Sequence, residues 1–444
     1  MNYEERLQNV SVLGAAGKMG SGILLLTSVE LADLSLKPEN KGKSFVLNAI
    51  DVSDEALTGV MRYLKSQVLK IAEKKIVALR AIYKNRQDLI ENSEIIDQYV
   101  FDVLSVVRPG TRLEATYESG IIFEAIREDP ALKVRIYTQI KENNPNHPWF
   151  FTNTSSIPIS ELDEKAGLGG SIIGFHFYNP PAIQKLVEVI KAKNTLSELE
   201  DFALTFAKNL RKIVVPSNDI AGFIGNGHFM RDILYATSQV DLLLKDLSFV
   251  EAVYAINKIS HEYLIRPMGI FQLIDYVGVD VCSYILSVMN SHLENEELSS
   301  TLLNKVLDLG VKGGQYSDGS QKDGFLKYEK GKITGVFDPG KKEYIPVQVI
   351  QGKVEEKMGI MPPVLPWKSV VSNPAKEEIL KSYFMEIKKS ASFGASLTLS
   401  YAVNSRQIGL HLVNTKVAFN EKDVNTVLLT GFFHAYGPVN EYVL

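Results

Sequence analysis

Short apolar runs alternate with amphipathic stretches through the first half of the chain. Residues 9–23, "NVSVLGAAGKMGSGI", begin as an apolar run that favours a β-strand, and after Gly14 they continue in small, helix-favouring residues. The segment "GIIFEAIREDPALKVRIYTQI" predicts a strand, a turn and an amphipathic helix, and "PWFFTNTSSIPISEL" predicts another strand and a loop. Strands that alternate with helices predict a parallel, doubly wound sheet, so this part of the chain belongs to the α/β class.

A polar and apolar pattern of helical period runs from Leu57 to about Val107. We expect a helical insertion there, within an N-terminal domain of residues 1–217. Basic side chains gather on it, at Lys74, Lys75, Arg80, Lys84 and Arg86. Such residues usually form a solvated helix face; the alternative is attraction for a polyphosphate group on a substrate.

The chain becomes helical after "VVPSNDIAGFIGN", and two of its later stretches resemble each other. One passes through "SFVEAV" to a turn at Pro267–Gly269, and the other passes through "NEKDVNTV" to a turn at Gly437–Pro438. We interpret them as tandem copies of one helical domain, at residues 218–330 and 366–444, the second copy being degenerate. The connecting region is rich in Gly, Lys and Asp, and we assign residues 331–365 as a linker with short strands.

Length and charge narrow the classes of protein. The 444 residues exceed what one hydrophobic core usually supports. With 48 basic against 52 acidic side chains, the chain is not expected to bind nucleic acid or membranes mainly by charge. No apolar stretch reaches the roughly 20 residues that span a bilayer, so we expect no membrane anchor. The single cysteine, Cys282, allows no intramolecular disulfide, and the N-terminus lacks the pattern of a signal peptide. We therefore predict a cytoplasmic protein without a metal site.

Three glycines lie between the first predicted strand and helix: Gly14, Gly17 and Gly20. Their spacing allows a tight turn, the approach of a pyrophosphate to the backbone and close packing of the helix, whose first N–H groups can hold phosphate. Asp51 ends the second strand, where a carboxylate would bind an adenosine ribose and select NAD over its 2′-phosphorylated relative. It lies farther from Gly20 than the usual span of about 20 residues. The alternatives are a glycine-rich turn without a ligand and an aspartate that merely begins the turn "DVSDEA".

Several segments resemble one family, the L-3-hydroxyacyl-CoA dehydrogenases of fatty-acid β-oxidation. The resemblance covers most of residues 8–330 in the right order, through "VLGAAGKMGSGI", "IIFEAIRED", "TNTSSIPISEL", "GFHFYNPPAIQKLVEVI" and "GFIGN". It implies a Rossmann-type N-terminal domain, all-α C-terminal domains similar to that of 6-phosphogluconate dehydrogenase, and NAD as cofactor. It also implies oxidation of a 3-hydroxyacyl-CoA to the 3-ketoacyl-CoA. The tandem helical copies resemble the dehydrogenase part of multifunctional β-oxidation proteins, without a hydratase part.

The resemblance places the family's catalytic residues on this sequence. Its His and Glu pair falls on His176 and Glu188, its serine on Ser155 of "NTSS" and its asparagine on Asn226 of "GFIGN". Residues expected to contact the cofactor are Gly14, Gly17, Lys18, Met19, Gly20, Asp51 and Glu128. Ala221 and Gly227 stand where the family usually has proline and arginine, and the glycine turn is one residue longer than usual.

The chemistry supports these roles independently. Oxidation of a secondary alcohol by NAD needs a base for the hydroxyl proton, and imidazole titrates close to neutral pH. A carboxylate on the other ring nitrogen would fix the tautomer, and the "YNPP" turn could bring Glu188 beside His176. Ser155 and Asn226 could hydrogen-bond the substrate oxygen. The alternatives are a core histidine, a solvent-facing glutamate, a capping serine and a helix-start asparagine, with Glu128 as an exposed turn carboxylate.

Other functions and assemblies stay open. One alternative is a dehydrogenase of a small 3-hydroxy acid without CoA, and another is a catalytically silent NAD-binding protein. A duplicated helical domain would find its partner in the same chain, so we predict a monomer with an intrachain pseudo-dimer, with a homodimer as the alternative. The sequence does not specify acyl chain length, reaction direction or partner enzymes.

Overall fold

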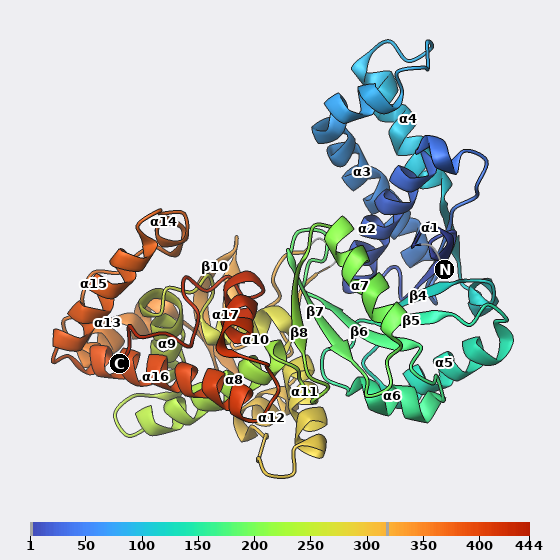
Figure 1. The fold of residues 1–444 in the computed structure, drawn as a ribbon. Helices are drawn as coiled ribbons and strands as arrows, with labels where there is room; N and C mark the ends of the chain where they lie inside the picture. The colour runs from blue at the N-terminus through green and yellow to red at the C-terminus, as the bar shows by residue number, and fades with distance from the viewer. Residues whose placement is uncertain (1–2, 317–318) are drawn as a thin grey trace. The chain divides into compact units, whose positions relative to one another are not determined.

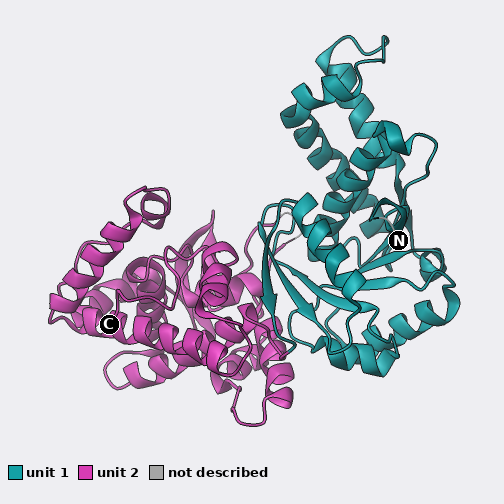
Figure 2. Ribbon diagram, viewed as in Figure 1, with its two compact units in different colours: residues 1–219 teal, residues 220–444 magenta. Residues whose placement is uncertain are grey.

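Two compact units make up the chain, Met1–Asp219 and Ile220–Leu444 (Figure 2). The computed structural model describes residues 3–316 and 319–444. Each unit has its own hydrophobic core. The predicted fold class is confirmed: a mostly parallel sheet with helices forms the first unit, and a mainly helical unit follows.

An eight-stranded sheet with the order β3-β2-β1-β4-β5-β6-β7-β8 is the centre of the first unit (Figure 1). Its strands are β1 (Asn9–Leu13), β2 (Val46–Ile50), β3 (Val107–Gly110), β4 (Ile121–Glu124), β5 (Trp149–Thr152), β6 (Ile172–Phe177), β7 (Leu186–Lys191) and β8 (Ile213–Ser217). Neighbouring strands are parallel except for β6 and β7, which are antiparallel. The strand order reverses between β1 and β4, and ligands of open α/β sheets bind beyond the carboxyl ends of the strands at such a point.

Helices cover both faces of this sheet. The helices of this unit are α1 (Tyr3–Arg6), α2 (Lys18–Ser35), α3 (Asp54–Ile82), α4 (Asn92–Ser105), α5 (Pro130–Asn143), α6 (Ile159–Ala166) and α7 (Ser197–Asn209), with single turns at Pro38–Asn40 and Leu113–Thr116. In β5, Trp149 and Phe151 contact Phe202 of α7, whereas Phe150 contacts Tyr137 of α5. Because successive strand residues point to opposite faces, an uninterrupted apolar run is what a sheet covered on both sides requires.

The helical insertion after β2 is an antiparallel pair, α3 and α4, that extends away from the sheet (Figure 1). Ser53 begins α3, and its side chain accepts a hydrogen bond from the N–H of Ala56 at 3.2 Å. The buried residues of α3 include Leu57, Val60 and Leu64, at helical spacing. One face of α3 therefore packs inward, and the other face keeps its charges in water.

The second unit combines helices with a small antiparallel sheet of order β11-β10-β9. Its helices are α8 (Gly225–Leu243), α9 (Phe249–Lys258), α10 (Ile270–Val277), α11 (Val279–His292), α12 (Thr301–Asp308), α13 (Val347–Met358), α14 (Trp367–Val371), α15 (Lys376–Lys389), α16 (Phe393–Asn414) and α17 (Glu421–Thr430), with a π-helical turn at Ile259–Tyr263. Its strands are β9 (Leu326–Glu329), β10 (Lys332–Asp338) and β11 (Glu343–Pro346). The small sheet consists of the short strands that the sequence predicts for the connecting region.

The segment 331–365 has the short strands that the sequence predicts, but it also contains a helix and packs into the core of the second unit. It contains β10, β11 and α13, and the side chains of Ile350, Val354 and Met358 are buried in the core of the second unit. Gly331 before β10 and Lys342 after it have positive φ, whereas Gly335 lies within β10 and Gly352 within α13. A composition rich in Gly and Lys thus belongs here to an integral part of the second unit.

A polar seam joins α8 of the first helical copy to α16 of the second. The residues of this seam are His228, Arg231, Asp232, Arg266, Glu296, Ser405 and His411. Arg266 donates to Asp232 at 2.8 Å, and Arg231 forms two bonds to Glu296 at 2.5 and 2.8 Å. Ser405 and His411 lie on α16. The hydroxyl of Ser405 lies 3.2 Å from Nε2 of His228, and Nε2 of His411 lies 3.1 Å from Oε1 of Glu296. The second copy therefore packs on the first within this unit.

The two helical copies share one detailed contact. Gly269 packs against the side chain of Asn257 so closely that a Cβ would lie 2.3 Å from it, and Gly437 packs against Asn425 with the same spacing. In each copy the glycine follows its asparagine by the same number of residues, and the asparagine Oδ1 accepts a backbone N–H beyond that glycine. This shared contact supports the interpretation of a tandem repeat.

Candidate active site

The glycine turn joins β1 to α2. Gly14 has a φ of +75°, which favours glycine, and a Cβ there would lie 2.5 Å from the carbonyl oxygen of Ala125. A Cβ on Gly20 would lie 1.9 Å from the carbonyl oxygen of Gly14. The helix therefore packs directly on the turn. Gly17 is the N-cap of α2 and offers no side chain to its first amides, which suits a helix start that receives phosphate.

Asp51 reaches this turn despite the long loop that precedes β2. Its Oδ2 accepts a hydrogen bond from the N–H of Ala16 at 2.9 Å, and its Oδ1 accepts one from Val52 at 2.8 Å. Lys18 and Met19 are the first two residues of α2, and partial burial lowers the pKa of Lys18. A glycine turn, an uncapped helix start and a carboxylate at the end of the second strand together fit an adenine dinucleotide. The individual contacts of Lys18, Met19 and Asp51 with a cofactor stay predictions.

His176 and Glu188 lie directly opposite each other in the antiparallel pair of β6 and β7. Opposite residues share one face of a sheet, and here Nδ1 of His176 lies 3.0 Å from Oε2 of Glu188. Glu188 is fully buried and His176 is 9% exposed. Because a carboxylate can only accept, Nδ1 carries the proton, and Nε2 is the basic nitrogen of the neutral ring. The structure thus brings together the base and the carboxylate that the sequence nominates.

The loop that carries Ser155 follows β5 and is anchored by Glu128. Oε1 of Glu128 accepts hydrogen bonds from the N–H groups of Ser155 and Ser156, at 3.0 and 3.2 Å, and from the hydroxyls of Thr154 and Ser156, at 2.5 and 2.8 Å. Asn153, in the same loop, accepts from the N–H of Phe177 at 2.8 Å, which joins the loop to the strand of His176. Glu128 is therefore a support of the Ser155 loop and not an exposed turn carboxylate.

Sequence reasoning missed Lys133, a fully buried cation beneath this loop. Its Nζ lies 2.7 Å from Oε1 of Glu124 and 3.3 Å from Oε2 of Glu128. Glu124 also accepts hydrogen bonds from Tyr137 and Thr152. Burial alone would lower the pKa of Lys133, but Glu124 and then Glu128 raise it. Burial would raise the pKa of Glu128, but Lys133 and the hydrogen bonds from its loop lower it, so both side chains stay charged. The sequence did contain a sign that Lys133 is buried. Lys133, Tyr137 and Ile140 are spaced so that they lie on one face of α5, and that face points into the protein.

Asn226 belongs to the second unit, where it is the second residue of α8. Gly222 and Phe223, just before the helix, both have positive φ, and the N–H of Gly227 donates to the carbonyl of Gly222. A tight turn thus fixes the start of α8. The contact of Asn226 with the substrate stays a prediction.

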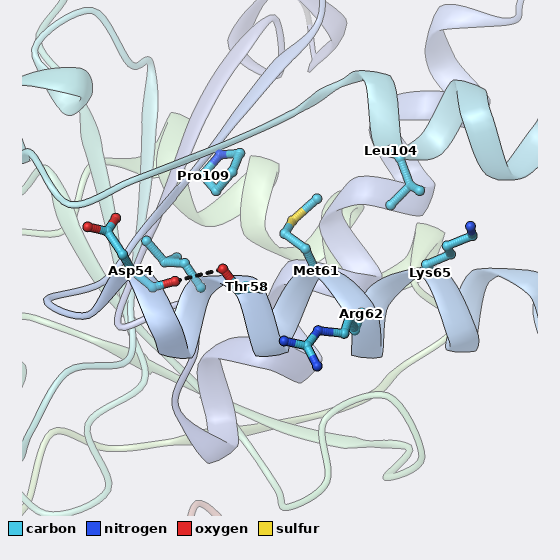
Figure 3. A pocket seen from close by; sticks show the side chains of 8 residues that line it. Asp54, Thr58, Met61, Arg62, Lys65, Leu104 and Pro109 are labelled. Atoms are coloured by element: carbon cyan, nitrogen blue, oxygen red, sulfur yellow. Dashed lines mark hydrogen bonds between the residues drawn. The ribbon is translucent and has the colours of Figure 1, made fainter.

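A pocket of about 500 Å³ opens at the base of the helical insertion (Figure 3). Leu57, Met61, Leu104 and Pro109 give it apolar walls, and the other lining residues are Asp54, Thr58, Arg62 and Lys65. Three basic residues farther along the insertion have structural partners: Lys75 pairs with Asp33, Arg80 donates to Asn92 and Arg86, after the end of α3, pairs with Asp88. These contacts favour the structural interpretation for those three side chains.

Among the residues that the structure describes, there is no metal site and no single membrane-spanning helix. Across residues 3–316 and 319–444, no group of three His, Cys, Asp or Glu side chains is arranged to hold a metal ion. Within the same residues, no single helix is both long and apolar enough to cross a membrane; α10 and α11 meet that criterion only as a pair, with a 91° bend between them.

A dinucleotide turn and an oriented histidine base, both at the carboxyl edge of one parallel sheet, are the combination found in NAD-dependent dehydrogenases that act on alcohols. Two family models match this chain: the 3-hydroxyacyl-CoA dehydrogenase NAD binding domain over residues 9–220 and the C-terminal domain of the same family over residues 222–328. The chain belongs to the 3-hydroxyacyl-CoA dehydrogenase family and is an NAD-dependent oxidoreductase.

Curated relatives match the same region. A probable 3-hydroxybutyryl-CoA dehydrogenase of Bacillus subtilis is 28% identical over 328 residues, which are 73% of this chain and 98% of that protein. The mitochondrial hydroxyacyl-coenzyme A dehydrogenase of Sus scrofa is 26% identical over 329 residues, 73% of this chain and 92% of that protein. A solved structure of 3-hydroxybutyryl-CoA dehydrogenase from Escherichia coli K12 has a TM-score of 0.63 at 19% identity and covers 98% of this chain and 90% of that one. The shared fold thus extends beyond residue 328, where the family models end.

Proposed function

We propose that this protein converts an L-3-hydroxyacyl-CoA to the 3-ketoacyl-CoA, reversibly and with NAD, and that His176 is its acid and base. The observation that carries the proposal is the 3.0 Å contact between Nδ1 of His176 and Oε2 of Glu188, in direct register at the carboxyl edge of the sheet. The names of the relatives support the choice of substrate class.

Each residue has a defined task in the proposed reaction. Nε2 of His176 takes the proton of the 3-hydroxyl group and returns it in the reverse direction. Glu188 holds the ring in the tautomer with Nδ1 protonated and stabilises the imidazolium that forms. Ser155, held in place by the bonds of its loop to Glu128, donates to the substrate oxygen, with Asn226 as a second donor. NAD, when bound, would supply the acceptor for the hydride that leaves the carbon bearing the 3-hydroxyl group.

The dinucleotide is placed by the first two strands. The amides at the start of α2 receive the pyrophosphate, and Asp51 receives the ribose hydroxyls while its charge repels a 2′-phosphate. Arg62 and Lys65, beside the apolar pocket at the insertion, are suited to the phosphates of CoA.

Steady-state kinetics test this proposal. Oxidation of NADH is measured with acetoacetyl-CoA, with longer 3-ketoacyl-CoA substrates and with free acetoacetate, and NADPH replaces NADH in a parallel series. We expect turnover of the thioesters only, with NADH preferred. Turnover of free acetoacetate alone would favour the enzyme of small 3-hydroxy acids, and absence of all turnover would favour a silent NAD-binding protein. Equal rates with both cofactors would contradict the role of Asp51.

A substitution tests the base. His176→Gln is expected to lower turnover at least about a hundredfold, the scale of a general acid and base, while NADH affinity changes little. His147→Gln is the matched control, because His147 is an exposed histidine of the same unit. A His176→Gln enzyme with most of its turnover would remove His176 from the mechanism.

Location and assembly belong to the same proposal. We place the protein in the cytoplasm, as its single cysteine indicates, and we propose a monomer in which the second helical copy takes the place of a partner subunit. The polar seam between α8 and α16 supports that arrangement.

A further inference from the structure

The carboxylate that orients His176 has a second donor on the same oxygen. The hydroxyl of Tyr178 donates to Oε2 of Glu188 at 2.9 Å, and this is the oxygen that lies 3.0 Å from Nδ1 of His176. Tyr178 follows His176 by two residues, a spacing that returns a side chain to the same face of an extended chain. The two rings are neighbours, with centroids 5.0 Å apart. Oε2 of Glu188 is therefore shared by His176 and Tyr178.

We propose that Tyr178 is a positioning residue that sets the basicity of His176 by sharing Oε2 of Glu188. This inference rests on the proposed function, in which His176 gains and loses a proton during turnover. A phenol that donates to the carboxylate stabilises its negative charge and leaves less of that charge to stabilise an imidazolium at Nδ1. Tyr178 thus makes His176 a weaker base than a dyad of His and Glu alone would contain.

The hydroxyl of Tyr178 is suited to this task because it keeps its proton. Burial, and then the charge of Glu188, raise the pKa of Tyr178 well above its usual range. At any pH at which an imidazole titrates, the phenol is therefore a donor. Glu188 itself is fully buried, so its hydrogen bonds are not weakened by bulk water.

Two charged side chains of the neighbouring elements, Glu128 and Lys212, have partners of their own. On β8, Val215 lies opposite Glu188 in the register. The loop after β5 meets β6 through Asn153, and its supporting carboxylate, Glu128, is neutralised by Lys133 of α5. Lys212, just before β8, lies 5.6 Å from the ring of Phe177 and donates to the carbonyls of Pro181 and Gln184. This cation beside the turn between β6 and β7 is thus bound to backbone carbonyls.

The test removes one oxygen atom. Tyr178→Phe is compared with the wild-type protein and with Tyr383→Phe, which removes the same atom from another buried tyrosine, one that donates to the carbonyl of Tyr263 in the second unit. The falling limb of kcat/KM against pH for reduction of acetoacetyl-CoA reports the pKa of His176. We expect Tyr178→Phe to shift this limb to higher pH by about half a unit. On the alkaline side of the profile, kcat/KM would then be roughly threefold higher than in the wild-type protein. Tyr383→Phe should leave it in place.

A second measurement does not depend on turnover. Histidine labelled with ¹³C at Cε1 is titrated by NMR, and the signal of His176 is assigned by its loss in His176→Gln. We expect the pKa of His176 to rise in Tyr178→Phe and to fall when 3,5-difluorotyrosine replaces Tyr178, because a more acidic phenol donates more strongly. In a Glu188→Gln background, Tyr178→Phe should shift nothing further.

The outcomes separate the two proposals. If the wild-type protein turns over no substrate, the proposed function fails, and the NMR titration still decides the role of Tyr178. If the pKa of His176 is the same in the wild-type protein, in Tyr178→Phe and in the fluorinated protein, the inference is overturned. If Tyr178→Phe does not fold, the fluorinated tyrosine, which keeps the shape and the hydroxyl, gives the answer alone.

Discussion

His228 lies inside the second unit, 1% exposed, at the polar seam between α8 and α16. Its Nε2 faces the hydroxyl of Ser405 at 3.2 Å and the carbonyl of that residue at 3.3 Å. Burial lowers the pKa of His228 from the usual 6.5 to about 4, against an opposing attraction from Asp232. A histidine with a lowered pKa is neutral in the folded protein at a pH where the unfolded chain is already protonated.

The sign and size of the effect follow by linkage. Below pH 6.5 the unfolded chain binds a proton that folded His228 does not, so the free energy of unfolding falls as the pH falls, until about pH 4. The full loss for this one residue is about 3 kcal/mol, and about 2 kcal/mol of it is expected by pH 5. His228→Gln keeps an amide donor for Ser405 but cannot titrate, so this part of the acid sensitivity should disappear.

A single fluorophore makes the measurement specific to the second unit. The chain has two tryptophans, Trp149 in the first unit and Trp367 in the second. In a Trp149→Phe background, the emission of Trp367, whose indole N–H donates to the carbonyl of Phe433, follows unfolding of the second unit in urea. The difference in unfolding free energy between this background protein and the same protein carrying His228→Gln is recorded from pH 7 to pH 5.

The matched control is His292→Gln, because His292 is an exposed histidine of the same unit. His228→Gln should be less sensitive to acid than the wild-type protein, and His292→Gln should follow the wild-type curve. Parallel curves for all three proteins over this range would refute the assignment of a neutral, buried His228.

Two further predictions concern the glycine turn and the second helical copy. Gly20→Ala places a Cβ 1.9 Å from the carbonyl oxygen of Gly14, so the turn must open, and we expect NADH to bind at least about tenfold more weakly by fluorescence titration. Gly59→Ala, a change on α3 that meets open space, should bind NADH normally, and equal affinities would contradict the role of the turn. Removal of residues 373–444 uncovers apolar side chains of the first helical copy, so we expect that protein to dimerise or aggregate in light scattering while the full-length chain stays monomeric. A monodisperse, monomeric truncation would show that the second copy replaces no partner.

Features encoded by local sequence could be predicted, because their physical cause lies within a few residues. The glycine turn follows from the backbone demands of one strand and one helix. The pairing of His176 with Glu188 follows from a hairpin whose two strands are adjacent in sequence. The helical insertion follows from a long pattern with one period.

Features that depend on distant contacts were not predicted. A lysine in a sequence usually indicates a solvent-exposed position. Only the fold shows that Lys133 is buried between two carboxylates, one of which, Glu124, ends β4. The short strands of segment 331–365 were predicted, but α13 was not, because few of its residues, among them Ile350 and Val354, are apolar and buried. Tyr178 was overlooked beside His176 because the acceptor of its hydroxyl lies on the next strand.

The polar seam has a consequence for how the two helical copies can diverge. In a symmetric homodimer, every substitution occurs twice, and each contact across the interface must have an identical counterpart. Within one chain the two sides mutate independently, and here His228 of α8 meets Ser405 of α16, while Glu296 of the first side meets His411 of the second. If two first copies packed on each other through this seam, Arg231, Arg266 and His228 of one copy would lie against the same residues of the other. A pairing of two first copies would therefore lack the contacts that Ser405 and His411 make in this seam.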